Sequence, residues 1–150
     1  MKKILLLNGP NLNLLGIRDV KIYGSETLKS IESRCKDFAK NKGFALLCRQ
    51  SNHEGELIDF IHLANVRQYC GIVFNAGAYA HYSYALRDAI DSVQIPVIDV
   101  HISDIYSRED FRKIDVLKEV CADSVIGKGT DGYVQAVELL ISKYIKRKPI

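Results

Sequence analysis

The sequence has 150 residues, of which 47% are hydrophobic and 26% are charged, and its formal net charge is +3. A chain of this length suits one domain with a substantial core and leaves no room for a second. The mild charge argues against nucleic-acid binding, which needs a concentrated basic face. One basic cluster lies near the end of the chain and is interpreted as a solvated helix end. It consists of Lys143, Lys146, Arg147 and Lys148.

Cysteine spacing and the N-terminus indicate the compartment. The four cysteines lack C-x-x-C spacing, which argues against a zinc ribbon or a redox pair and favours a reducing environment. The opening MKKILLL ends its apolar run at Asn8, short of the roughly 7 to 15 residues of a signal-peptide core. No stretch approaches the ~18 apolar residues of a membrane span. The sequence therefore predicts a soluble, cytoplasmic protein with no membrane partner.

Five short apolar runs alternate along the chain with longer helical patterns. Within each run the residues do not alternate between apolar and polar, which is typical of strands covered on both faces of a parallel sheet. The runs are 4–7, 44–48, 72–74, 97–100 and 125–126. In the helical patterns, apolar residues recur every three or four positions. These patterns run from Leu28 to Phe38, Leu57 to Ala64, Tyr82 to Val93 and Tyr133 to Tyr144.

The signals between these elements fit the same order. Ser25 is expected to cap the first helix, Gly43 to close it, and Pro96 comes just before the fourth strand. Alternating strands and helices predict a single α/β domain over residues 1–150, a flavodoxin-like open doubly wound five-stranded parallel sheet.

Polar residues follow the predicted strands, at the edge where such sheets bind ligands. Asn8 to Asn11 follow the first strand, Asn75 ends the third, and His101 ends the fourth. The connection after the first strand, NGPNLNLLGIRDVKIYG, is far longer than the usual 2 to 6 or so residues. We interpret segment 9–24 as a lid with Gly16 and Gly24 as its hinges.

A glycine-rich stretch at 127–132, GKGTDG, matches the G-x-G-x-x-G pattern of dinucleotide sites. That pattern belongs after the first strand, however, and here the chain is nearly finished. A tight turn with Thr130 or Asp131 capping the next helix explains the stretch better. A flavin or nucleotide binding protein of the same fold remains one alternative function, and a noncatalytic assembly protein is the other.

Metal and covalent chemistry have little support in the sequence. The histidines lack H-E-x-x-H spacing, and no G-x-S-x-G nucleophile elbow is present. What remains is acid–base chemistry with no cofactor and no metal, using Tyr23, Arg18, His101 and His81 around the polar edge. A tyrosine is a poor base at neutral pH, but a cation a few ångströms away favours its phenolate form.

Six segments carry a resemblance to a known family. They are NGPNLNLLGIR with YG at 23–24, QSNHEGELID at 50–59, NAGAYAHYSYALRDA at 75–89, IPVIDVHIS at 95–103, SREDFR at 107–112 and GTDGY at 129–133. The chain resembles type II 3-dehydroquinate dehydratase of the shikimate pathway, nearly end to end. The resemblance implies a flavodoxin-like subunit in a dodecamer of four trimers. It also implies a cofactor-free anti elimination of water from 3-dehydroquinate, through an enolate, to 3-dehydroshikimate.

The resemblance assigns roles to individual residues. Tyr23 matches the base that removes the C2 proton, and Arg18 matches the residue that keeps it ionised. His101 matches the general acid for the departing C1 hydroxyl, and Asn11 the group that steadies the enolate through a water. The residues implied to hold the substrate are Asn75, His81, Ile102, Ser103 and Arg112, with Arg108 from a second lid at 104–112 and Asp88 from a neighbouring subunit.

Several positions depart from the family pattern. Asp99, expected to hold a ring nitrogen of His101, stands where the family has glutamate, which is one methylene longer. Asp19-Val20 replaces a usual Glu-Pro, and Tyr82 adds a bulky ring near the site. Arg112 has a second interpretation, an i,i+3 ion pair with Glu109.

Overall fold

The computed structural model describes residues 1–145, which form a five-stranded sheet with every neighbouring pair parallel. In chain order the strands are β1 (Lys2–Asn8), β2 (Phe44–Gln50), β3 (Gly71–Asn75), β4 (Val97–His101) and β5 (Asp123–Ile126). Their order across the sheet is β2-β1-β3-β4-β5. This topology confirms the predicted flavodoxin-like sheet.

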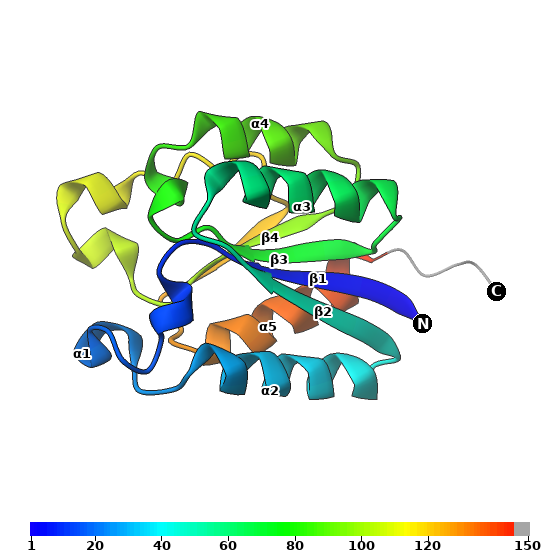
Figure 1. Ribbon diagram of the computed structural model, residues 1–150, viewed down its shortest axis with the longest axis horizontal. Helices are drawn as coiled ribbons and strands as arrows, with labels where there is room; N and C mark the ends of the chain where they lie inside the picture. Colours follow the sequence, from blue (N-terminus) through cyan, green and yellow to red (C-terminus); the bar gives the residue numbers. More distant parts are fainter. Residues whose placement is uncertain (146–150) are drawn as a thin grey trace.

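Helices cover both faces of the sheet (Figure 1). The α-helices are α1 (Val20–Tyr23), α2 (Leu28–Asn41), α3 (Glu54–Val66), α4 (Tyr84–Ser92) and α5 (Asp131–Leu139), which a π-helical turn at Leu140–Tyr144 continues. Short 3₁₀ helices lie at Leu12–Leu14, Gly77–His81, Ile105–Ser107 and Asp110–Lys113. Helices α2 and α5 pack on one face, and α3 and α4 pack on the other. Within residues 1–145, no helix has the length and apolar character needed to cross a bilayer.

The position of β1 between two helical layers explains why its sequence does not alternate between apolar and polar residues. Successive side chains of a strand point to opposite faces of the sheet. Ile4 and Leu6 belong to the core beneath α2 and α5, whereas Leu5 and Leu7 belong to the core beneath α3 and α4. All four side chains are buried. A strand between two helical layers therefore needs an apolar residue at every position.

The N-terminal cap of α2 differs from the prediction, because Thr27 takes the place expected for Ser25. The Thr27 hydroxyl oxygen accepts a hydrogen bond from the backbone N–H of Ser30 at 3.2 Å. Ser25 stands three residues before Leu28, the first helical residue, and so lies outside the cap position. The predicted closing signal is confirmed, since Gly43 adopts a left-handed φ of 89°.

The glycine-rich turn precedes α5 as predicted, but the expected side-chain cap is absent. Thr130 occupies the cap position with helical dihedral angles, and its side chain makes no capping bond. Its hydroxyl instead accepts from Arg34 at 3.4 Å, and Arg34 also pairs with Asp131 at 2.9 Å and Glu26 at 2.8 Å. The carboxylates of Glu26 and Asp131 thus lie near the N-terminus of α5. A nucleotide phosphate bound at this turn would be repelled by their negative charge.

The start of α4 and the end of the chain also bear on the predictions. Helix α4 starts at Tyr84, later than the pattern from Tyr82 suggested, because the Ser83 hydroxyl accepts from the Leu86 N–H at 3.0 Å and caps it. The basic cluster near the end of the chain was interpreted as a solvated helix end. Its first member, Lys143, is largely exposed near the end of the π-helical turn. The other members of the basic cluster, Lys146, Arg147 and Lys148, lie outside the described residues.

The backbones at the ends of β1 and β3 approach closely at Gly9, so this position has no room for a side chain. The Gly9 N–H donates to the Asn75 carbonyl at 2.7 Å, and a Cβ at Gly9 would lie 2.5 Å from the Ala76 carbonyl oxygen. We expect Gly9→Ala to lower the free energy of unfolding by about 1–3 kcal/mol, because the two backbones must separate.

Gly55 in α3 provides the matched control. A Cβ there meets nothing within 4 Å, so Gly55→Ala should leave stability unchanged or raise it by up to about 1 kcal/mol. Urea unfolding of both variants measures the difference. Equal effects of the two substitutions would contradict the proposed steric origin.

Candidate active site

A pocket opens where β1, β3 and β4 end and the loop segments 9–24 and 104–112 meet the sheet. Figure 1 shows these two segments at the same end of the sheet. The predicted site residues that line it are Arg18, Tyr23, Asn75, His81, His101, Ile102, Ser103, Arg108 and Arg112. Pro10, Leu12, Gly77 and Ile105 complete the lining. The pocket lies at the carboxyl edge of the sheet, as expected for a ligand site in this class of fold.

The hydroxyl of Tyr23 lies between two guanidinium groups. Arg108 Nη1 donates to the hydroxyl oxygen at 2.7 Å and Arg18 Nη2 at 3.4 Å. Both guanidiniums also face the ring, with their central carbons 4.6 Å (Arg18) and 5.3 Å (Arg108) from its centroid. Sequence proximity suggested Arg18 as the cation beside Tyr23, yet Arg108, 85 residues away, makes the shorter bond. The hydroxyl oxygen of Tyr23 is therefore the acceptor of two charged donors.

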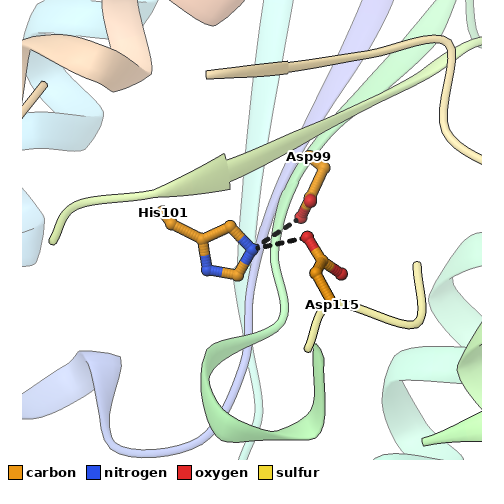
Figure 2. A group of neighbouring side chains, drawn as sticks. All are labelled: Asp99, His101 and Asp115. Atoms are coloured by element: carbon orange, nitrogen blue, oxygen red, sulfur yellow. Dashed lines mark hydrogen bonds and ion pairs between the residues drawn. The ribbon is translucent and has the colours of Figure 1, made fainter. Parts of the chain in front are cut away.

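The imidazole of His101 is held by two buried carboxylates (Figure 2). Its Nε2 lies 3.0 Å from Asp115 Oδ2 and 3.2 Å from Asp99 Oδ1. Asp99 precedes His101 by two residues on β4 and points to the same side of the strand. Asp115 follows the Asp110–Lys113 turn and reaches the imidazole from a separate segment. Its side chain is only 2% exposed.

Burial and charge together set the protonation of this cluster. Burial by itself lowers the pKa of His101, but the bonds from Asp115 and Asp99 outweigh it and raise that pKa to about 10. Burial raises the pKa of the Asp99 carboxyl, whereas the bonds to His101 and Asp99 overcome burial and lower the pKa of Asp115. Two carboxylates this close to one another share a proton, as like charges cannot both ionise freely. The cluster thus pairs one imidazolium with one full carboxylate charge, carried mainly by Asp115.

His81 differs from His101 in its hydrogen-bond partner and in its protonation state. Its Nδ1 lies 2.8 Å from the Ile114 carbonyl oxygen, which can only accept, so Nδ1 carries the hydrogen and Nε2 is the acceptor. Burial is the main reason that the pKa of His81 falls below its ordinary value, with the charge of His101 acting in the same direction. The two rings stack with centroids 6.2 Å apart. One neutral and one protonated imidazole therefore face the same pocket.

The amide of Asn75 is fixed by a buried network that sequence reasoning missed. Its Nδ2 donates to the Tyr133 hydroxyl at 2.9 Å, and its Oδ1 accepts from the Gly77 N–H at 3.0 Å. Tyr133 in turn donates to Asn8 Oδ1 at 2.6 Å. Tyr133 belongs to a predicted helix and ends the GTDGY segment, but nothing in the sequence links its hydroxyl to Asn75. Asp115 was also missed, and it lies outside all six recognised segments.

Three predicted residues, Asn11, Asp88 and Asp99, are not part of the pocket lining, and Asp99 instead contacts the imidazole of His101. Asn11 is exposed, adopts a left-handed φ of 68°, and donates its backbone N–H to Asn52 Oδ1 at 3.0 Å. Asp88 is exposed on α4, and its predicted place in a neighbouring subunit's site stays a prediction. Arg112 lines the pocket and also makes the alternative i,i+3 pair with Glu109.

The buried cluster also has the composition of a cation site. One nitrogen of His101 and one oxygen each of Asp99 and Asp115 lie within 4.8 Å of one another. Such N and O donors can bind a divalent metal. The distances of 3.0 and 3.2 Å from the imidazole nitrogen are equally those of charge-assisted hydrogen bonds, which account for the cluster with no further group.

Comparisons with known proteins identify the family. The model of dehydroquinase class II matches residues 2–141. A 3-dehydroquinate dehydratase of Bacillus cytotoxicus is 54% identical over 143 residues, which are 95% of this chain and 97% of that protein. The chain belongs to the class II dehydroquinase family.

Solved structures of this family share the fold throughout. The type II dehydroquinase of Butyrivibrio crossotus superposes with a TM-score of 0.92 at 48% identity, covering 94% of this chain and 98% of that one. That of Propionibacterium acnes gives 0.91 at 35% identity, covering 95% and 98%. The resemblance seen in the sequence is therefore confirmed, and with it the predicted class of enzyme, a hydro-lyase.

The buried cluster predicts a pH dependence of stability in this dehydroquinase. The pKa of His101 is raised from about 6.5 in the unfolded chain to about 10, so the stabilisation from its proton is complete below about pH 6.5 and is lost as pH rises toward 10. The free energy of unfolding of the wild type should therefore fall relative to His101→Gln over this range, on the order of a few kcal/mol.

Urea unfolding at pH 6.5 and 9.5 or so tests this expectation. The matched control is His62→Gln, on an exposed position of α3, for which the difference from the wild type should not change with pH. A gap between wild type and His101→Gln that stays constant or widens with rising pH would contradict the assignment of a protonated imidazole.

Proposed function

We propose that the protein eliminates water from 3-dehydroquinate in the anti sense, without a cofactor and through an enolate, to give 3-dehydroshikimate. One observation carries the proposal. A tyrosine hydroxyl bound by two guanidiniums and an imidazole held by two buried carboxylates line one pocket. In this proposal the tyrosine serves as the general base and the imidazole serves as the general acid. Relatives at 54% and 53% identity bear the name 3-dehydroquinate dehydratase.

In the first step the Tyr23 phenolate accepts the C2 proton. This hydrogen is α to a ketone, so the electron pair of the broken C–H bond moves to the carbonyl oxygen and gives an enolate. Arg18 and Arg108 hold the tyrosine as phenolate before the step, and Arg108 acts from the shorter distance. We assign Asn11 to the enolate oxygen through a water, because a fixed donor there stabilises the developing charge by about 3–4 kcal/mol.

In the second step the protonated His101 acts on the C1 hydroxyl. The C1–O bond breaks as the oxygen takes a proton from the imidazolium and leaves as water. The enolate electron pair forms the C1=C2 double bond and restores the ketone. The phenol of Tyr23 and the neutral imidazole then exchange one proton with solvent, which returns both groups to their starting states.

Other pocket groups bind the substrate in this proposal. Arg112 receives the carboxylate, because its planar fork suits two parallel hydrogen bonds, and it exchanges its surface pair with Glu109 for this stronger contact. Asn75, His81 and the backbone of 102–103 bind hydroxyls. The Nε2 of His81, left as an acceptor by the Ile114 contact, suits a hydroxyl donor.

Closure and assembly complete the proposal. Segments 9–24 and 104–112 act as lids, and the Arg108 contact with Tyr23 joins one lid to the other. Asp88, exposed on α4, is available to a neighbouring subunit in a dodecamer of four trimers. A cytoplasmic location remains a prediction.

Incubation with 3-dehydroquinate tests substrate and reaction together. The wild type should produce the conjugated enone, followed by its ultraviolet absorbance. Tyr23→Phe should lower kcat by at least 10² to 10⁴ or so, because it removes the general base. Tyr144→Phe is the control, since its hydroxyl binds Asp123 Oδ2 at 2.8 Å outside the pocket lining and outside both lids. No enone from the wild type would refute the proposed function, and an active Tyr23→Phe variant would refute the base.

The two guanidiniums beside Tyr23 make a separate prediction. Arg108→Ala and Arg18→Ala should each lower kcat/KM and move its ascending pH limb to higher pH, because removing a guanidinium takes away positive charge that favours the phenolate. The effect should be larger for Arg108→Ala, since its bond is 2.7 Å against 3.4 Å for Arg18. Arg67→Ala, at the exposed end of α3, serves as the control for loss of a cation. An unmoved limb in both pocket variants would assign the arginines to substrate binding alone.

A further inference from the structure

The segment 114–117 contacts both histidines of the pocket and carries a carboxylate to which no role has been given. We propose that Asp115 is a positioning residue for His101, which fixes the orientation of the imidazole and keeps Nε2 protonated, so that Nδ1 is the nitrogen that delivers the proton. This inference rests on the proposed function, in which His101 is the general acid.

Hydrogen bonding makes Asp115 the better anchored of the two carboxylates. Its Oδ2 lies 3.0 Å from His101 Nε2, and its Oδ1 accepts the backbone N–H of Leu117 at 3.0 Å. Asp99 lies farther from Nε2, at 3.2 Å, and its Oδ2 is buried without a hydrogen-bond partner among residues 1–145. A carboxylate with both oxygens engaged is held in one orientation, and it stabilises its anionic form.

The segment that carries Asp115 is itself tied to the pocket wall. The Val116 N–H donates to the Ala80 carbonyl at 2.8 Å, and the Val116 carbonyl accepts from Arg87 Nη1 at 2.7 Å. The Ile114 carbonyl accepts the hydrogen of His81 Nδ1. Four consecutive residues therefore set the tautomer of His81 and bind Nε2 of His101. The pocket-side nitrogens of the two rings, Nε2 of His81 and Nδ1 of His101, are determined by the same short segment.

This arrangement defines the path of the proton. Both carboxylates accept from Nε2, which keeps its hydrogen throughout. The Nδ1 hydrogen is then the one transferred to the departing hydroxyl, and it leaves a neutral ring that is still bound to Asp115. The other titratable groups beside the ring are Asp99 on β4 and His81, and Arg112 lines the same pocket. Of the charged groups, only the two carboxylates favour the imidazolium.

Asp115→Asn tests the proposal, with Glu119→Gln as the matched control. Glu119 lies in the same stretch of chain, and its exposed carboxylate pairs with Arg87 at 3.1 Å. We expect Asp115→Asn to lower kcat about 10- to 100-fold through misplacement of the acid, with KM for 3-dehydroquinate changed less than about twofold. The Glu119→Gln variant should keep the wild-type kcat.

Nuclear magnetic resonance of the four histidine rings supplies a readout that needs no substrate. The titration midpoint of His101 should move to lower pH in Asp115→Asn and stay unchanged in Glu119→Gln. Asp115→Glu keeps the charge, so it should retain a high His101 midpoint and lose less kcat than Asp115→Asn. This variant still tests the positioning role if Asp115→Asn does not fold. A wild-type midpoint and kcat in Asp115→Asn would overturn the proposal.

The two hypotheses fail separately in these measurements. Absence of 3-dehydroquinate turnover in the wild type refutes the proposed function, whereas a shifted His101 midpoint in Asp115→Asn still supports the positioning role. Normal turnover in the wild type with an unshifted midpoint in the variant refutes the positioning role alone.

Discussion

The buried ion cluster of His101, Asp99 and Asp115 is the interaction on which the arrangement of the pocket depends. Removing charges from water costs several kcal/mol for each ion unless partners are close and well oriented. The imidazole therefore requires at least one carboxylate at hydrogen-bond distance, and the second carboxylate must share a proton. Because Asp115 comes from outside the sheet, this electrostatic requirement draws the segment after 104–112 against β4 and encloses one wall of the pocket.

Opposite charge requirements divide the pocket into two halves. Around Tyr23, two guanidiniums supply positive charge and donate to its hydroxyl. Around His101, carboxylates lie on the protein side of the ring and leave the pocket side free. A base and an acid with such different surroundings can be in their active protonation states at the same pH, which is the common way in which one site performs both steps of an elimination.

Close backbone packing positions the groups between these halves. Gly9 allows β1 and β3 to end side by side, and the Tyr133 hydroxyl joins the asparagines at the two strand ends, Asn8 and Asn75. The amide of Asn75 is thereby oriented before any ligand arrives. Preorganisation of this kind reduces the entropy that binding must overcome. The carboxylate of Asp99 on β4 is accompanied at His101 by a second one, from Asp115.

The sequence by itself determined the alternating strands and helices, the parallel sheet and the edge of the sheet that carries the pocket, because apolar periodicity and turn residues act locally and the carboxyl edge follows from the parallel fold. Its motifs also predicted Tyr23, Arg18, His101 and Arg112 as site residues, and all four line the pocket. Only the tertiary structure decided that Arg108 makes the shorter contact with Tyr23, that Asp115 binds His101 and that Tyr133 orients Asn75. These contacts join residues 14 to 85 positions apart, and their geometry depends on how loops pack against strand ends, for which local patterns carry no signal.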